Sequence, residues 1–130
     1  EEHPETLSIY SYIASSLSGM LRHKEALALD EKVLEVRSRV LGDEHPAAIR
    51  TVYNVAVSQK GVKRCDDAHR TATRGLILAQ NIGEEEEAAQ FVELLSLIEL
   101  QLQYSSSNSS KQKRLLKKIE DRKMAKQKAE

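Results

Sequence analysis

A His-Pro dipeptide occurs twice in this chain, beginning at His3 and at His45, and the two copies lie 42 residues apart. Similar residues follow both copies at that same offset: Leu7/Ile49, Ile13/Val55, Ala14/Ala56, Ser16/Ser58, Gly19/Gly61, Arg22/Arg64 and Ala26/Ala68. A fixed period of this length is the signature of a protein built from stacked structural repeats. Because stacked repeats form an extended surface and not a closed pocket, the pattern predicts binding of another protein.

The composition favours an all-α protein. Of the 130 residues, 40% are hydrophobic and 31% are charged, but only 4% are aromatic and none is tryptophan. Core volume must therefore come from Leu, Ile, Val and Ala, which suit close helix packing. The single cysteine, Cys65, excludes an intrachain disulfide and a cysteine-based zinc cluster. It fits a reducing compartment, so we expect a cytoplasmic protein.

Nothing in the sequence predicts a membrane span or a leader peptide. No apolar run approaches the roughly 20 residues that are needed to cross a bilayer. The acidic start, Glu1 followed by Glu2, has the wrong sign for a secretory signal. Because a repeat motif begins at His3, the sequence leaves open whether the chain is a fragment of a longer array.

Charge is unevenly distributed, although the chain holds 20 basic and 20 acidic residues. Residues 105–130 carry nine basic residues against three acidic ones, and residues 1–104 carry the compensating acidic excess. The stretch 105–110 consists only of Ser and Asn. We therefore predict repeats over residues 1–104, a linker over 105–110 and a basic helix or tail over 111–130.

The basic tail carries its charge on Lys111, Lys113, Arg114, Lys117, Lys118, Arg122, Lys123, Lys126 and Lys128. We expect Ser109 or Ser110 to cap its helix, whose apolar residues Leu115, Leu116 and Ile119 form a narrow stripe. The tail then serves as a cap docked over the repeats, as a contact for nucleic acid or another acidic polymer, or as a membrane-surface helix. It has no aromatic side chain for base stacking, and its few large apolar residues argue against membrane insertion.

Proline and periodicity predict where the helices lie. Pro4 and Pro46 suit the first helical position, because the N–H that proline lacks would have no intrahelical partner there. Apolar residues at three- and four-residue steps predict helices over residues 4–20 and 24–41. Repeat two has the same layout from Pro46, with its second helix ending at Gly83.

A third repeat begins without its partner helix. Residues 84–87 are four glutamates, which favour a helix start because they complement the positive end of the helix dipole. The following segment, residues 88–102, is so apolar that we expect cover on more than one side. If the terminal helix does not cover it, a partner protein or a second copy of the chain is expected to do so.

These helix pairs resemble the tetratricopeptide repeat, in which small residues occupy fixed places on both helices. Ala14 with Ala26, and Ala56 with Ala68, match that spacing. The 42-residue period and the connector Leu-Gly-Asp-Glu-His-Pro at residues 41–46 are similar to the kinesin light chain variety. The resemblance implies an α-solenoid, a right-handed stack of antiparallel helix pairs followed by a basic C-terminal helix.

The resemblance covers residues 3–104, with departures in repeat two. Cys65 stands where an aromatic residue is usual, and Gly75 lies inside the second helix. In this family the first helix of each pair lines the concave face, and partner peptides lie across it. The implied groove residues are Ser8, Ser11, Tyr12 and Ser15 in repeat one and Arg50, Tyr53, Asn54, Val57 and Lys60 in repeat two.

Asn54 occupies the place where such grooves often keep an asparagine that holds the peptide backbone. An amide side chain suits this role because it donates and accepts hydrogen bonds at once. Arg50 and Lys60 are expected to attract an acidic ligand. Repeat one has Tyr12 at the matching position, so a carboxylate clamp is not predicted.

No set of residues predicts catalysis, a metal site or a cofactor. His3 and His45 recur with the repeat and are interpreted as structural turn residues, and Cys65 as a small buried helix residue. The acidic runs lack the interleaved glycines of calcium loops. We therefore expect a non-catalytic adaptor or scaffold. The alternative is a structural subunit of a large ribonucleoprotein or cytoskeletal assembly that uses the basic tail.

Overall fold

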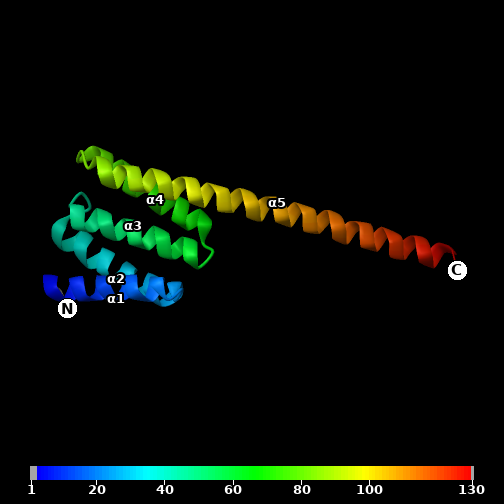
Figure 1. The fold of residues 1–130 in the computed structure, drawn as a ribbon, viewed down its shortest axis with the longest axis horizontal. Helices are drawn as coiled ribbons and strands as arrows, with labels where there is room; N and C mark the ends of the chain where they lie inside the picture. The colour runs from blue at the N-terminus through cyan, green and yellow to red at the C-terminus, as the bar shows by residue number, and fades with distance from the viewer. Residues whose placement is uncertain (1–2, 130) are drawn as a thin grey trace. The chain divides into compact units, whose positions relative to one another are not determined.

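The computed structural model describes residues 3–129, so the acidic start, Glu1 and Glu2, and the last residue, Glu130, lie outside the described residues. Within the described range every element is a helix and there is no strand, which confirms the all-α prediction. The helices in chain order are α1 (Pro4–Gly19), α2 (His23–Leu41), α3 (Pro46–Gly61), α4 (Cys65–Asn81) and α5 (Glu85–Ala129) (Figure 1).

Each His-Pro dipeptide begins a helix, as predicted. His3 and His45 are the N-cap residues of α1 and α3. Their Nδ1 atoms accept the backbone N–H of Glu5 at 3.3 Å and of Ala47 at 3.1 Å. Each imidazole thereby satisfies one of the N–H groups that a helix start leaves without a partner. The histidines are therefore structural, and the 42-residue period of the sequence is the spacing between two helix N-caps.

The turn inside each helix pair also repeats. Leu21, between α1 and α2, has a φ of 61°, and Lys63, between α3 and α4, has a φ of 68°. Both are in the left-handed region, which is uncommon for residues other than glycine. Because the two positions are equivalent in the repeats, the same turn geometry recurs although the two side chains differ.

Small residues bring the helices together. The four alanines that carry the repeat pattern, Ala14, Ala26, Ala56 and Ala68, are almost fully buried. An alanine at a crossing point lets two helix backbones approach closely, and the larger side chains fill the space on either side. The packed helices α1 to α4 therefore follow the repeat pattern predicted from the sequence.

The first part of α5 packs against repeat two through Phe91, whose side chain is only 1% exposed. Its ring meets Tyr53 of α3 edge to face, with 5.5 Å between ring centroids. On α4, a Cβ at Gly75 would lie 2.3 Å from two atoms of this ring. The glycine inside α4, a departure from the family pattern, therefore makes room for Phe91.

The expected break at residues 105–110 is wrong. These residues lie inside α5, so neither Ser109 nor Ser110 begins a separate helix. Serine and asparagine lower helix stability by only a fraction of 1 kcal/mol each, and an established helix propagates through such residues unless proline intervenes. The packed segment ends at Glu99, and a second unit begins at Leu100.

The cover predicted for residues 88–102 is also only partly present. Phe91, Leu94 and Ile98 are buried, whereas Val92 is 50% and Leu97 49% exposed. One face of the first part of α5 therefore packs on repeat two. The sequence predicts burial on more than one side, because it shows how apolar a helix is but not how many neighbours it has.

The second unit is helical over its described residues, 100–129. Its basic side chains are exposed, and so are the apolar Leu115, Leu116 and Ile119. Among the helices of the described residues, none combines the length and the apolar character needed to cross a membrane.

Candidate functional site

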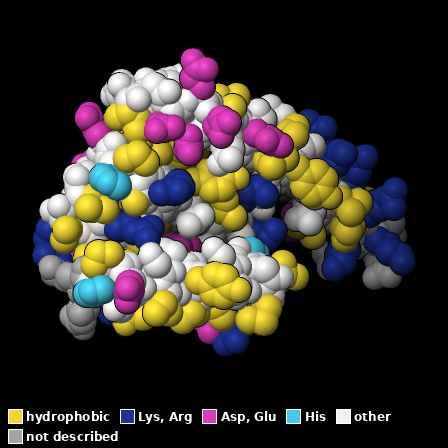
Figure 2. All heavy atoms as spheres, turned by 60° about the vertical axis from the view of Figure 1, so that its left-hand side comes forward, with side chains coloured by type: hydrophobic (Ala, Val, Ile, Leu, Met, Phe, Trp, Pro, Cys, Tyr) yellow, Lys and Arg dark blue, Asp and Glu magenta, His cyan; other side chains and the backbone are white. Residues whose placement is uncertain are grey.

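Two depressions lie on the surface where α1, α2 and α3 meet. Figure 2 shows one face of the molecule, on which hydrophobic, basic and acidic side chains are interspersed. Recognition on such a face depends on placed polar groups as much as on apolar area.

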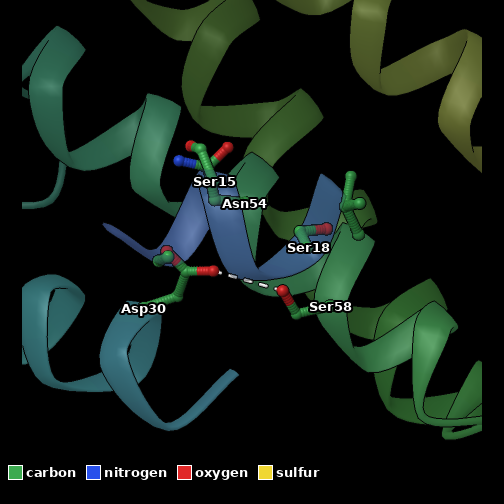
Figure 3. A pocket seen from close by; sticks show the side chains of 7 residues that line it. Ser15, Ser18, Asp30, Asn54 and Ser58 are labelled. Carbon is green, nitrogen blue, oxygen red and sulfur yellow. Dashed lines mark hydrogen bonds between the residues drawn. The ribbon is translucent and has the colours of Figure 1, made fainter. Parts of the chain in front are cut away.

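The first depression is a polar pocket of about 140 Å³ between the later part of α1, the middle of α2 and the later part of α3. Figure 3 shows five of its polar side chains arranged around one space, with Asp30 pointing toward Ser58. The lining residues are Ala14, Ser15, Ser18, Asp30, Asn54, Val57 and Ser58. Hydroxyl, amide and carboxylate oxygens therefore dominate this pocket.

Asp30 is the charged residue of the polar pocket. Its side chain is 3% exposed, and its Oδ2 accepts the Ser58 hydroxyl at 3.2 Å. Its Oδ1 is buried without a hydrogen-bond partner among the described residues. Burial raises the pKa of Asp30 to about 6, and the hydrogen bond from Ser58 opposes that rise only in part. Near neutral pH the fold therefore holds a largely uncompensated carboxylate.

The second depression is a basic pocket of about 260 Å³ between the start of α1, the end of α2 and the start of α3. Arg37 donates from Nη1 to Thr51 Oγ1 at 2.8 Å, which orients the guanidinium. Burial, together with the nearby Arg50, lowers the pKa of Arg37 from its usual range, although it remains a cation. The lining residues are Pro4, Leu7, Ser8, Arg37, Val40, Leu41, Ala47 and Arg50.

The structure distributes the predicted groove residues between these two pockets. Ser15, Asn54 and Val57 line the polar pocket. Ser8 and Arg50 line the basic pocket. Both pockets thus draw on α1 and α3, the two helices that the resemblance assigned to a partner-binding face.

The other four predicted groove residues line neither pocket. Ser11 is half-buried, and its Oγ has no hydrogen-bond partner among the described residues. Tyr12 is exposed, and Lys60 is partly buried. Tyr53 packs against Phe91 and so contributes to the α3/α5 contact.

Two charged residues of the pockets, Asp30 and Arg37, are not among the predicted groove residues. Both lie on α2, and the groove had been assigned to the first helix of each pair only. For Asp30 a signal exists in the sequence. Asp30 falls on the apolar stripe of α2 that includes Ala26 and Val33, and the residue 42 positions later is Ala72. A carboxylate that interrupts an apolar stripe in one repeat alone is a reason to examine its neighbourhood.

The remaining reactive residues have structural surroundings. Cys65 is buried at the start of α4, as predicted. His69 contacts Glu99 with 3.3 Å between Nε2 and Oε1, a link between α4 and α5. Within residues 3–129 no group of three or more His, Cys, Asp or Glu side chains is placed to hold a metal ion.

This architecture defines the class of protein: a stack of antiparallel helix pairs whose period, caps and small crossing residues recur together. Consistent with it, the sequence profile of the tetratricopeptide repeat family matches residues 5–81, and the chain belongs to that family. Tetratricopeptide repeats generally mediate protein–protein interactions and are typically non-catalytic. A search of curated proteins found no match to this chain.

Proposed function

We propose that the chain is a non-catalytic adaptor or scaffold that binds a segment of a partner protein along the α1/α3 face. One observation carries this proposal. Five residues expected in the groove line two depressions between α1, α2 and α3, and these depressions carry opposite charge. Opposite charges placed on one face fix the direction in which a bound segment lies.

The dimensions suit a short extended segment. Ser8 in the basic pocket and Ser15 in the polar pocket lie seven residues apart on α1. That separation corresponds to about 10 Å along a helix axis, which is the span of about three extended residues. One side chain of a bound segment can therefore enter the basic pocket while another reaches the polar pocket.

The basic pocket supplies the first recognition element. Arg37, held by Thr51, and Arg50 present two guanidinium groups at one depression. Guanidinium groups bind carboxylates with paired, charge-assisted hydrogen bonds. We infer that a Glu or Asp of the partner binds here, and that Asn54 holds backbone groups of the same segment.

Labelled peptide pools test this proposal. One pool fixes a glutamate in an otherwise degenerate 12-residue sequence, and the matched pool fixes glutamine. We expect the intact chain to prefer the glutamate pool, and the double variant Arg50→Glu, Asn54→Ala to bind it at least about tenfold more weakly. Lys24→Glu is the charge-matched control, because Lys24 is exposed and lines neither pocket. Unchanged binding by the double variant would contradict the proposal.

The exposed tail supports a second candidate function, contact with nucleic acid or an acidic polymer. The nine cations of residues 111–128 lie on exposed helical positions. Binding that rests on them releases counterions, so we expect the affinity for a single-stranded RNA to fall steeply between 50 and 200 mM salt. Neutralising Lys111, Lys113, Lys117 and Lys118 to Gln should flatten that dependence. An affinity that barely responds to salt would remove this candidate.

Two finer assignments follow from the sequence. We propose that the repeat is of the kinesin light chain-like variety, for which the 42-residue period and the connector at residues 41–46 are the support. We also propose a cytoplasmic setting, which the single cysteine favours.

A further inference from the structure

The buried carboxylate of Asp30 has no charge partner among the residues that the structure describes. Among the described residues no basic side chain pairs with it, and only Ser58 donates to it. An uncompensated buried carboxylate destabilises a protein unless something neutralises it. Repeat two stacks with an alanine, Ala72, at the same position, so the architecture does not require an acid there.

The surroundings of Asp30 supply further hydrogen-bond acceptors. Ser15 and Ser18 face the pocket from α1, and Asn54 and Ser58 face it from α3. Hydroxyl oxygens and an amide oxygen accept hydrogen bonds, and a carboxylate accepts several. Because the terminal torsion of an aspartate is soft, either carboxylate oxygen can turn toward the pocket. The pocket therefore offers a convergent set of acceptors and one negative charge.

We propose that this polar pocket binds the ammonium group of a lysine side chain from the partner segment. This inference rests on the proposed function and names the second recognition element of the same face. An ammonium carries three N–H donors on a compact, tetrahedral head. Asp30 neutralises its charge and accepts one donor, and the oxygens of Ser15, Ser18 and Asn54 are within the same pocket for the others.

The composition of the pocket favours ammonium over other cations. One carboxylate with hydroxyl and amide oxygens around it matches the three donors of an ammonium better than the five donors of a planar guanidinium. A divalent metal ion requires more charged oxygen ligands than the single carboxylate present here. Apolar contact with Ala14 and Val57 suits the methylene stem that carries the ammonium.

A lysine in the polar pocket gives the α1/α3 face two recognition elements of opposite charge. A segment with an acidic residue in the basic pocket and a lysine about three residues away satisfies both pockets at once. Reversing the order of the two residues would reverse the chain direction in which the segment lies. The partner class is therefore a segment that carries both charges about three residues apart.

A small-molecule titration tests the pocket without a known partner. n-Butylammonium, which reproduces the end of a lysine side chain, is titrated to about 100 mM because such a small ligand binds weakly. The backbone amide resonances of the intact chain report the contact. We expect shifts confined to the neighbourhood of Ser15, Ser18 and Asn54, and none with n-butanol, which has the same apolar stem without the charge.

Two variants provide the comparison. Asp30→Asn keeps the shape of the side chain but removes its charge, and it should abolish the ammonium-specific shifts. Glu31→Gln removes an exposed carboxylate from the adjacent position of α2 and should leave them unchanged. His23 Nδ1 lies 3.4 Å from Oγ of Ser18, a residue of the pocket, so all titrations are run at one pH. Equal shifts with butanol, equal shifts in Asp30→Asn, or no shift at all would overturn the inference.

Peptide pools separate this inference from the proposed function. N-acetylated pools fix lysine, arginine, acetyl-lysine or norleucine near the glutamate, and a pool with a free amino terminus reports an α-amine. We expect the lysine pool to bind about tenfold more tightly than the norleucine pool, a difference that Asp30→Asn removes. If the glutamate preference persists without any lysine preference, the proposed function stands and this inference fails. If the lysine preference persists without the glutamate preference, the proposed role of Arg50 fails instead.

Discussion

The two interfaces between successive repeats share one backbone plan and differ in what fills them. The first interface is where α1 and α2 meet α3, and it contains the polar pocket and the buried Asp30. The second is where α3 and α4 meet α5, and Phe91 fills it by packing over Gly75. At two of the positions where the second helices of the repeats differ, Asp30 corresponds to Ala72 and Val33 to Gly75.

Under the proposed function, the first interface serves recognition and the second serves stability. At the second interface the ring of Phe91 is buried against Tyr53 and Gly75, and the apolar side chains of Leu94 and Ile98 on the same helix are buried too. The first interface keeps an open polar space and a carboxylate that lowers stability. Features that lower stability and occur in only one of the repeats are more readily explained by binding than by folding. Variants at the two interfaces should therefore have effects of opposite sign on stability.

The largest expected effect is at the second interface. Phe91→Ala should lower the free energy of unfolding by about 3–5 kcal/mol, because it removes a fully buried ring and leaves a cavity. Urea unfolding followed by circular dichroism measures this loss. Val92→Ala, at a half-exposed neighbour on the same helix, should cost less than about 1 kcal/mol. Similar losses from the two variants would show that Phe91 does not hold this interface.

A smaller effect is expected from the glycine beneath the ring. Gly75→Ala should destabilise the chain by about 1–3 kcal/mol, although alanine is the better helix former, because the new methyl group would overlap the ring of Phe91. Gly19→Ala is the matched control, since a Cβ at Gly19 meets no atom within 4 Å. That variant should be neutral or stabilising by about 0.5 kcal/mol. Thermal unfolding compares the two, and a stabilising Gly75→Ala would contradict the packing described here.

The smallest expected effect is at the first interface and has the opposite sign. In the folded chain the pKa of Asp30 is raised to about 6 from a reference value of 3.8. Between these values the folded state binds more protons, so stability from this group falls as pH rises from about 4 to 6. Asp30→Asn should therefore stabilise the chain by about 1–2 kcal/mol at pH 7.5 and by nearly nothing at pH 4.

Urea titrations of both proteins across that pH range measure this difference. Glu31→Gln should show no such pH-dependent gain, because the Glu31 side chain is exposed. If Asp30→Asn destabilises the chain at pH 7.5, the carboxylate is part of the structural core, and its assignment to recognition is undermined.

Much of the fold was predictable because its signals are local. The His-Pro caps depend on a side chain two residues from the N–H that it accepts, so their role follows from spacing alone. The helices α1 and α2 end within one residue of the predicted bounds, since capping and apolar periodicity act within a few turns. Residues 105–110 were mispredicted because their weak helix propensity was treated as a break.

The site was only partly predictable. Ser8, Ser15, Arg50, Asn54 and Val57 follow from the family pattern once the repeat register is known. Asp30 and Arg37 do not, because their importance depends on burial and on neighbours from other helices. A buried carboxylate and a solvated one are the same letter in a sequence.

The sequence by itself determined the period, the helix starts, the small residues at the crossings and the family. Each of these depends on contacts within a few residues, or on a pattern that repeats. Only the tertiary structure decided that Asp30 is buried with no charge partner in the described part of the chain, that Gly75 lies under Phe91, and that two pockets of opposite charge share one face. These features depend on residues 14 to 38 positions apart that meet only when the helices stack, so their electrostatics and packing exist in the folded chain alone.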